Sequence, residues 1–258
     1  MPSAIITGAS SGIGAAVAEE LGRRGWKVGL IARRAERLEA LAERIGEGAA
    51  VAVADVTDRV ALERAIAQLE QTLGPCDLML ANAGIGETVS GTRFDTGSAL
   101  RIIDVNVNGV IHALGAVIGP MVERGSGHIA VTSSVAGYRG LPGFGAYSAS
   151  KSCVTTLVES LRVDLRGSGV SMTAIHPGFV VSELTDTNTF SMPFLVKTDK
   201  AARVIVDGLE RKRSIICFPW QMRCLMWLVK HLPNWLYDMA VGASSPTRPK
   251  RTGAEVGP

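Results

Sequence analysis

The sequence has 258 residues, of which 47% are apolar and 20% charged, and its formal net charge is +3. This length and composition suit one large α/β domain with a sizeable core. A net charge this small, with no basic run interleaved with aromatic residues, argues against a nucleic-acid partner. The four cysteines and four histidines are scattered along the chain. Their spacing predicts reduced core thiols, a cytoplasmic location and no metal site.

Short apolar runs typical of buried strands alternate with amphipathic segments typical of helices. The first strand is expected at residues 4–6, which leaves no room for a signal peptide. Further strands are expected at 27–32, 50–54, 77–81, 128–132 and 170–175. Asp58 is placed to cap one of the intervening helices, and Pro120 is expected to kink a long helix at about 98–123. No apolar run is judged long enough to span a membrane.

Alternation of strands and helices predicts a Rossmann-type, doubly wound parallel sheet of about seven strands with helices on both faces. The sequence shows no linker before about residue 243, so residues 1–242 are expected to form one domain. Within it we expect a substrate lid near 183–197 and a C-terminal helical extension at 219–242. Residues 243–258 are polar and rich in proline, which predicts a disordered tail.

The turn after the first strand contains glycines at positions 8, 12 and 14. Strand, glycine-rich turn and helix form a phosphate-binding corner, because free N–H groups and the helix dipole attract an anion. The spacing G-x-x-x-G-x-G is not the common G-x-G-x-x-G, and a strand-to-helix turn that binds nothing is an alternative interpretation.

Tyr147 and Lys151 are four residues apart, which places them on one face of the helix expected at about 146–166. A tyrosine that acts as an acid or base near neutral pH needs its pKa lowered by roughly three units, or about 4 kcal/mol. A lysine ammonium at about 4 Å supplies about that much at an effective dielectric near 20. The alternative is an ordinary surface pair.

Taken together, these patterns resemble the short-chain dehydrogenase/reductase family over roughly residues 2–218. The resemblance is carried by motifs that occur in the family's order and spacing: Thr7-Gly8-x-x-x-Gly12-x-Gly14, Asn82-Ala83-Gly84, Asn106, Ser134, Tyr147-x-x-x-Lys151 and Pro177-Gly178. Two positions depart from the family pattern, because Ala81 replaces a frequent asparagine and Ser182 a frequent threonine.

The resemblance implies a catalytic role for four residues. Tyr147 would be the general acid in carbonyl reduction and the base in alcohol oxidation. Lys151 would lower the pKa of Tyr147 and bind the nicotinamide ribose, Ser134 would bind the substrate oxygen, and Asn106 would hold a water for proton relay. The implied cofactor-binding residues are Gly8, Ser10, Ser11, Gly12, Ile13, Gly14, Arg33, Asp55, Val56, Asn82, Ala83, Gly84, Tyr147, Lys151, Pro177, Gly178, Val180 and Ser182.

Charge at the end of the second strand favours NADP(H) over NAD(H) as the cofactor. A dinucleotide without a 2′-phosphate prefers a carboxylate there, whereas this chain has Ala32-Arg33-Arg34. An arginine fork matches a phosphate, and Arg33 is the expected binder. Arg34 is interpreted as a solvated residue at the start of a helix.

The substrate side is expected to be apolar. Leu141, Pro142 and Phe144 precede Tyr147, and the lid region carries Leu184, Phe190, Met192, Phe194 and Leu195. These residues favour a bulky, apolar carbonyl or alcohol, although they could simply pack the lid. A wide apolar surface on the long helix favours a homodimer or homotetramer, as is common in the family.

Residues 219–240 hold three of the four tryptophans together with basic residues. We expect two short helices beside the substrate entrance, and a peripheral membrane contact is a second possibility for this segment. The functional prediction is an NADP(H)-dependent oxidoreductase that interconverts a carbonyl and a secondary alcohol. The alternative is a non-catalytic dinucleotide-binding regulatory or scaffold protein on the same fold.

Overall fold

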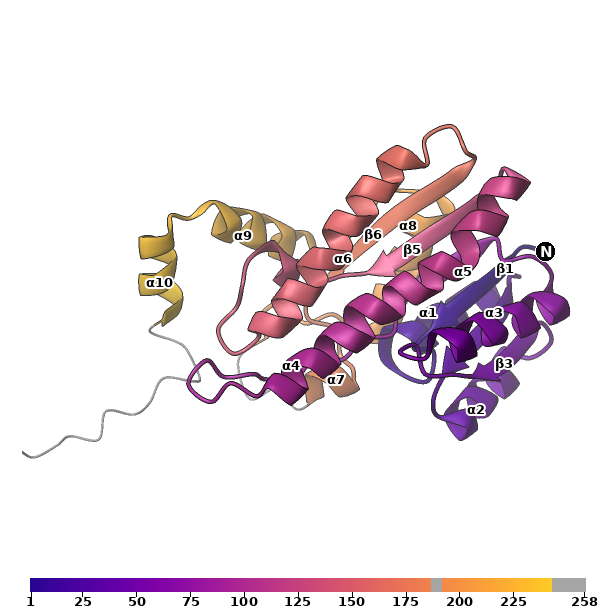
Figure 1. The fold of residues 1–258 in the computed structure, drawn as a ribbon, viewed down its shortest axis with the longest axis horizontal. Coiled ribbons are helices and arrows are strands. Elements are labelled where there is room, and N and C mark those ends of the chain that lie inside the picture. The colour runs from indigo at the N-terminus through magenta and orange to yellow at the C-terminus, as the bar shows by residue number, and fades with distance from the viewer. Residues whose placement is uncertain (187–191, 243–258) are drawn as a thin grey trace, which may run out of the picture.

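A computed structural model describes residues 1–186 and 192–242, and these fold around one parallel sheet (Figure 1). Residues 187–191 of the expected lid and residues 243–258 of the expected tail lie outside the described residues. Within the described ranges, seven strands lie in the order β3-β2-β1-β4-β5-β6-β7. The strands are β1 Ser3–Thr7, β2 Lys27–Ala32, β3 Ala49–Val53, β4 Leu78–Ala81, β5 Gly127–Thr132, β6 Val170–Pro177 and β7 Ile215–Phe218.

Strand order reverses between β1 and β4, because the chain first builds β2 and β3 on one side of β1 and then β4 to β7 on the other. This confirms the predicted Rossmann-type sheet. The carboxyl ends of β1, β4 and β5 meet beside this switch point. Ligands of open parallel sheets bind at that place, so the fold itself selects where a site should be sought.

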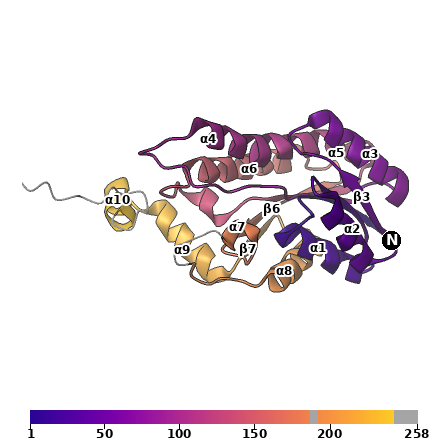
Figure 2. The ribbon, with the colours of Figure 1, turned by 90° about the horizontal axis from the view of Figure 1, so that it is seen from below.

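Helices cover both faces of the sheet because its strands carry apolar side chains on both faces. Figure 2 shows the sheet edge-on between the two helical layers. One layer contains α3 (Arg59–Leu73), α4 (Thr96–Ile103), α5 (Gly109–Arg124) and α6 (Gly145–Asp164). The opposite layer contains α1 (Gly12–Arg23), α2 (Ala35–Ile45) and α8 (Thr198–Glu210). About seven strands were expected, but the sequence pattern indicated neither α8 nor β7 individually.

The long predicted helix is confirmed, with an interruption that the sequence did not reveal. A π-helical turn, η1 (Asp104–Asn108), joins α4 to α5, and Pro120 lies inside α5. The continuous segment Thr96–Arg124 is long and apolar enough to cross a membrane by length and composition, which corrects the expectation for apolar runs. Many of its apolar residues, however, pack into the core against the sheet, so we interpret it as a core helix of this fold.

Local predictions at two kinds of residue had different outcomes. Asp58 caps α3 as predicted, since its carboxylate accepts a hydrogen bond from the Ala61 N–H at 3.0 Å. The expectation of four core thiols is wrong for Cys153 and Cys224, which are exposed on helices α6 and α9 (Trp220–His231). Both sit on outward helical faces, where a small thiol need not be buried.

Gly8 ends β1 with a φ of +69°, in the left-handed region that favours glycine. A Cβ placed there would lie 2.7 Å from the Ala83 Cα, in the backbone that follows β4. Gly25, between α1 and β2, also has a positive φ of +82°, but a Cβ there would meet nothing within 4 Å. Both glycines therefore need a left-handed backbone, but only Gly8 lacks room for a side chain.

We predict that Gly8→Ala destabilises the fold more than Gly25→Ala does. Left-handed backbone costs an alanine about 1–2 kcal/mol at either position, and overpacking against Ala83 adds about 1–3 kcal/mol at Gly8 only. Urea denaturation of both variants measures the difference. Equal losses would show that the turn can move away from β4 without cost.

Candidate functional site

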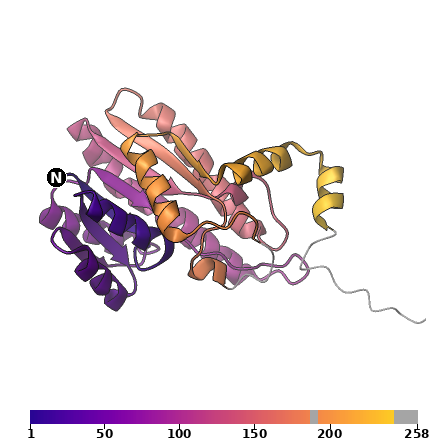
Figure 3. The ribbon, with the colours of Figure 1, turned by 180° about the vertical axis from the view of Figure 1, so that it is seen from behind.

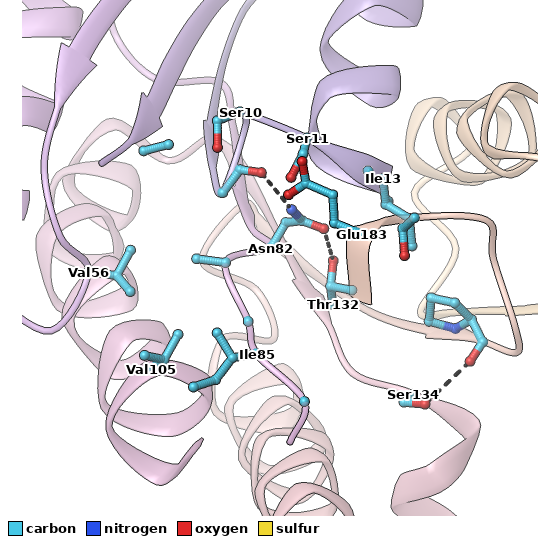
Figure 4. Close-up of a pocket in the computed structure, with 18 of the residues that line it drawn as sticks. Ser10, Ser11, Ile13, Val56, Asn82, Ile85, Val105, Thr132, Ser134 and Glu183 are labelled. Carbon is cyan, nitrogen blue, oxygen red and sulfur yellow. Dashed lines mark hydrogen bonds between the residues drawn. The ribbon is translucent and has the colours of Figure 1, made fainter. Parts of the chain in front are cut away.

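A cavity of about 640 Å³ opens at the carboxyl ends of the strands, beside the switch point (Figure 4). Its lining comes from the turn after β1, the ends of β2 to β6, the first turns of α6 and the start of α7 (Glu183–Asp186). The lining of the cavity includes the glycine-rich turn at one end and Tyr147 at the other. An elongated ligand with a phosphate near its middle suits this arrangement.

The side chain of Asn82 fixes the strand ends around the cavity. Its amide nitrogen donates to the Thr7 carbonyl at 3.2 Å, and its amide oxygen accepts from the Thr132 hydroxyl at 3.1 Å. The Asn82 N–H donates to the Thr7 hydroxyl at 3.0 Å. One side chain thus joins β1, β4 and β5, and the bond between Asn82 and Thr132 is visible in Figure 4.

Three of the predicted catalytic residues meet at the other end of the cavity. Ser134 begins the short 3-10 turn η2 (Val135–Tyr138), whereas Tyr147 and Lys151 lie in the first turns of α6. The Ser134 hydroxyl hydrogen-bonds to Tyr147 and accepts from the Ala136 N–H at 3.1 Å. The Lys151 ammonium donates to the Thr132 carbonyl at 2.8 Å and lies 5.8 Å from the centre of the Tyr147 ring.

Burial acts on the acid–base groups in a direction that the sequence analysis did not predict. Burial raises the pKa of Tyr147, and the hydrogen bond from Ser134 opposes this rise. Burial also lowers the pKa of Lys151 to about 8, because the ammonium is removed from water. The expected lowering of the Tyr147 pKa by Lys151 is therefore not seen in these surroundings: desolvation penalises the phenolate and the ammonium alike.

Asn106 lies in the π-helical turn η1 and is fully buried. Its amide nitrogen donates to the Ile85 carbonyl and to the Ser150 hydroxyl, both at 3.0 Å, and its oxygen accepts from the Ile85 N–H at 2.8 Å. It is not among the described residues that line the cavity. Its side chain therefore positions the segment after β4 and α6, and the water-binding role expected for Asn106 stays a prediction.

Charged residues gather at the opposite end, where β2 stops. The Arg33 guanidinium lies 3.6 Å from the Asp55 carboxylate, and its side chain is 71% exposed. The Arg34 guanidinium donates to the Ser10 and Ser11 hydroxyls at 2.9 and 2.8 Å. Arg34 is thus tied to the glycine-rich turn, which corrects the interpretation of this residue as merely solvated. Both arginines line the cavity, so both can reach an anion there.

A smaller apolar pocket of about 120 Å³ adjoins the large cavity. Ser134 and Tyr147 line both spaces, and so do Gly178 and Thr185. The walls of the small pocket are apolar: Val135, Ala136, Leu141, Phe144, Phe179 and Met222. The sequence anticipated Leu141 and Phe144, and Met222 comes from α9, one of the two short helices expected beside the substrate entrance.

Most of the predicted cofactor-binding residues are brought together in the lining of the large cavity. Gly14 is an exception among the described residues, since it packs against Gly8 and Asn82 without reaching the cavity. Lining residues that sequence reasoning missed are Ala32, Arg34, Ala54, Ile85, Gly86, Glu87, Val105, Thr132, Ser133, Glu183 and Thr185. Four of these, Ala32, Ala54, Thr132 and Ser133, end or directly follow a predicted strand, so strand ends were the signal that could have found them.

The residues present fit a nicotinamide dinucleotide. The turn after β1 leaves space for a pyrophosphate at the start of α1, and the arginines at the end of β2 offer donors to a phosphate on the adenosine ribose. Lys151 and Tyr147 line the same cavity, and Tyr147 also lines the apolar pocket. Such a cofactor supplies or accepts a hydride when bound.

Comparison with known proteins agrees with this geometry. The family model for short chain dehydrogenases matches residues 2–191. An uncharacterized oxidoreductase of Myxococcus xanthus is 46% identical over 242 residues, covering 92% of this chain and 95% of that protein.

Two solved structures share the fold. A short-chain dehydrogenase/reductase from Burkholderia phymatum in complex with NAD has a TM-score of 0.82 and 23% identity, covering 93% of this chain and 95% of that one. An alcohol dehydrogenase from Thermococcus sibiricus complexed with 5-hydroxy-NADP has a TM-score of 0.76 and 27% identity, covering 84% and 96%. On the family match and the close relative, this chain belongs to the NAD(P)-dependent short-chain dehydrogenase/reductase family.

Proposed function

We propose that this enzyme interconverts an apolar carbonyl compound and its secondary alcohol, with NADP(H) as the hydride carrier and Tyr147 as the proton donor and acceptor. One observation carries the proposal: Ser134 and Tyr147 line both the large polar cavity and the small apolar pocket. A substrate seated in the apolar pocket would present its oxygen at this junction. Family membership sets aside the non-catalytic alternative.

The proposed division of labour follows from the hydrogen-bonding capacity of each group. In reduction, the Tyr147 hydroxyl gives its proton to the substrate oxygen as negative charge develops there. The Ser134 hydroxyl donates a second hydrogen bond to that oxygen. Lys151, anchored by the Thr132 carbonyl, places a positive charge beside the Tyr147 ring and stabilises the phenolate that remains.

A preference for NADP(H) is supported by the charge at the adenosine end. Arg33 and Arg34 line the cavity where β2 ends, and no Asp or Glu occupies residues 30–35. Guanidinium groups bind a phosphate dianion through paired N–H donors. The Ser10 hydroxyl beside Arg34 offers a further donor.

We predict that Tyr147→Phe lowers kcat/KM for carbonyl reduction by about 10²–10⁴-fold, the range usual for loss of a general acid. Binding of NADPH should change less than about twofold, because the ring still fills its place. A panel of apolar aldehydes and ketones, followed by NADPH absorbance, measures the first effect, and equilibrium titration measures the second.

Tyr138→Phe is the matched control. Its phenol is half-buried beside Cys217, in the adjacent turn η2, and Tyr138 is not among the described residues that line either space. Its loss should change kcat/KM by less than about threefold. Retention of activity by Tyr147→Phe, or equal losses in the two variants, would contradict the assignment of Tyr147.

The titration of Lys151 should be visible in the pH dependence of kcat/KM. A pKa lowered to about 8 means that the ammonium is charged below about pH 8 and neutral above it, whereas the raised pKa of Tyr147 keeps the proton donor loaded at neutral pH. We predict that kcat/KM for reduction is level near pH 7 and falls as pH rises through about 8. Lys151→Arg keeps the charge at higher pH and should move the fall upward. An unmoved fall would assign the titration to another group.

We also propose that the enzyme assembles as a homodimer or homotetramer through the layer formed by α4, α5 and α6. Large apolar side chains remain exposed on these helices: Leu100, Ile111, Val122 and Val163. A self-complementary contact between copies would cover them. The cytoplasmic location stays a prediction.

The C-terminal extension supports a peripheral membrane contact. Helices α9 and α10 (Asn234–Gly242) leave the sheet edge together, as the yellow end of the ribbon shows in Figure 3. Arg139 holds them in place: its guanidinium donates to the Val229 carbonyl and to the Asn234 amide oxygen, both at 3.0 Å, and stacks on the Tyr237 ring. These contacts fix the extension on the rest of the protein.

Helix α9 has two apolar faces. Met222 and Met226 are buried towards the apolar pocket, whereas Trp227 and Leu228 face outward, and Trp227 is 61% exposed. In α10, Trp235 is 68% exposed. Tryptophan beside basic side chains is typical of surfaces that lie in a membrane interface.

The C-terminal part of the sequence also carries an excess of basic over acidic residues. Residues 219–258 contain five of the 27 Lys and Arg residues and two of the 24 Asp and Glu residues, so residues 1–218 contain 22 of each sign and are neutral overall. Of the net charge of +3, +1 lies in residues 219–242, which carry the exposed tryptophans, and +2 lies in residues 243–258, which follow them in the sequence. Each basic residue near an anionic lipid surface is worth about 1 kcal/mol.

We predict that the enzyme sediments with phosphatidylglycerol-containing vesicles and that Trp227→Ser with Trp235→Ser weakens this binding more than about tenfold. Binding of each variant should be weaker to neutral vesicles than to anionic ones, and weaker at high salt than at low salt. Val60→Ser removes an exposed apolar side chain from α3, outside the proposed contact between copies, and serves as the control. Wild-type protein that stays in solution would refute the contact, and a vesicle-independent change in mass would assign this face to a second copy.

A further inference from the structure

Glu183 holds the arginines at the adenosine end of the cavity. Its carboxylate accepts from the Arg34 guanidinium at 3.0 Å and is also bonded to Arg37, a full turn along α2. Figure 4 shows Glu183 beside Ser11, to whose hydroxyl it hydrogen-bonds. Glu183 comes from α7, which follows β6, so this contact crosses the mouth of the cavity from one half of the sheet to the other.

The Arg34 guanidinium has only five N–H donors, and their directions are fixed by its plane. In this structure one edge donates to the Ser10 and Ser11 hydroxyls, and the other nitrogen donates to Glu183. A phosphate bound in the bidentate manner would need two parallel donors of the same guanidinium. Glu183 therefore occupies part of the capacity that a phosphate at Arg34 would use.

Charge opposes joint occupancy as well. The two guanidinium groups of Arg34 and Arg37 lower the pKa of Glu183 to about 2, so its carboxylate is ionised throughout the neutral range. A ribose 2′-phosphate carries up to two further negative charges at neutral pH. Two anions on one guanidinium repel each other, and the repulsion grows as they approach within a few ångströms.

We propose that Glu183 competes with the 2′-phosphate of NADP(H) for Arg34, so that NADP(H), unlike NAD(H), releases α7 from the arginine pair. The proposal rests on the NADP(H) preference argued above. Competition of this kind is reciprocal: the factor by which Glu183 weakens binding of the phosphate is the factor by which the phosphate favours the released state of Glu183.

Release of α7 would be felt in the substrate pocket. Thr185, two residues after Glu183, is buried and lines both the large cavity and the apolar pocket. Its hydroxyl donates to the Val180 carbonyl at 2.9 Å and accepts from the Ser182 N–H at 2.9 Å, so this turn is tied together locally. Movement at Glu183 is thereby passed to a wall of the substrate pocket, and the 2′-phosphate influences a place that it does not touch.

Glu183→Gln tests the competition by equilibrium binding. The amide keeps the size of the side chain and removes its charge. We expect the dissociation constant for NADPH to fall by about three- to tenfold, in line with loss of an exposed ion pair and of repulsion, and that for NADH to change less than about twofold. Glu87→Gln is the control, because Glu87 also lines the cavity but pairs with Arg101 at 3.0 Å, away from the arginine pair.

The outcomes separate this inference from the proposal on which it rests. The ratio of NADH to NADPH dissociation constants in the wild type tests cofactor preference, whereas the change of that ratio in Glu183→Gln tests competition. An unchanged ratio in Glu183→Gln would overturn the competition. A reduced ratio, caused by weaker binding of NADPH, would also overturn it and would show that Glu183 supports Arg34 in binding the phosphate. An equal rise of the ratio in Glu87→Gln would reduce the effect to overall charge.

Hydrogen exchange tests the release of α7 without turnover or a nicotinamide ring. Adenosine 2′,5′-bisphosphate and adenosine 5′-monophosphate differ only in the 2′-phosphate. At saturation we expect backbone amides of residues 180–186 to exchange faster with the bisphosphate, and we expect this difference to vanish in Glu183→Gln. Equal exchange with both ligands in the wild type would show that the phosphate and Glu183 share Arg34 without displacement.

Discussion

The carboxamide of Asn82 is the interaction on which the arrangement of the site depends. It joins the ends of β1, β4 and β5 through Thr7 and Thr132. Parallel strands are held to each other along their length, but their ends are free to diverge once the ladder stops. The amide has a donor and an acceptor on one rigid plane, so it can fix two neighbouring strand ends at once. The glycine-rich turn and the anchor of Lys151 are both positioned relative to this amide.

The Thr132 residue links that scaffold to the chemistry. Its hydroxyl bonds to Asn82, while its carbonyl accepts from the Lys151 ammonium at 2.8 Å. A buried ammonium is costly unless it is hydrogen-bonded, and the cost appears here as a Lys151 pKa lowered to about 8. The same burial raises the pKa of Tyr147. The raised pKa keeps Tyr147 protonated, as a proton donor requires. A nearby positive charge must then stabilise the phenolate that forms during the reaction, and the Lys151 ammonium is already close to the Tyr147 ring.

Sequence reasoning succeeded where a physical requirement acts on neighbouring residues. Buried strands need continuous apolar runs, so the sheet and its switch point followed from β1 to β6. It failed where distant segments meet. Arg34 was interpreted as solvated because its partners, Ser10 and Glu183, lie 24 and 149 residues away. The π-helical turn at Asn106 was hidden for the same reason: the Ile85 and Ser150 groups that hold this side chain come from other elements.

The segments added after β6 have one feature in common: each brings a side chain to a site that the sheet has already built. Glu183 reaches the arginines at the end of β2, Thr185 the junction of the two spaces, and Met222 the apolar wall. The strand ends bring Asn82, Thr132 and Ser134 together at the large cavity. These later residues share the ribose end with Arg34 and the apolar pocket with Leu141 and Phe144, and none of them belongs to the sheet. Their effects should therefore appear in specificity before they appear in stability, since removing an exposed pair such as Glu183 and Arg37 changes the free energy of unfolding by only about 0–1 kcal/mol.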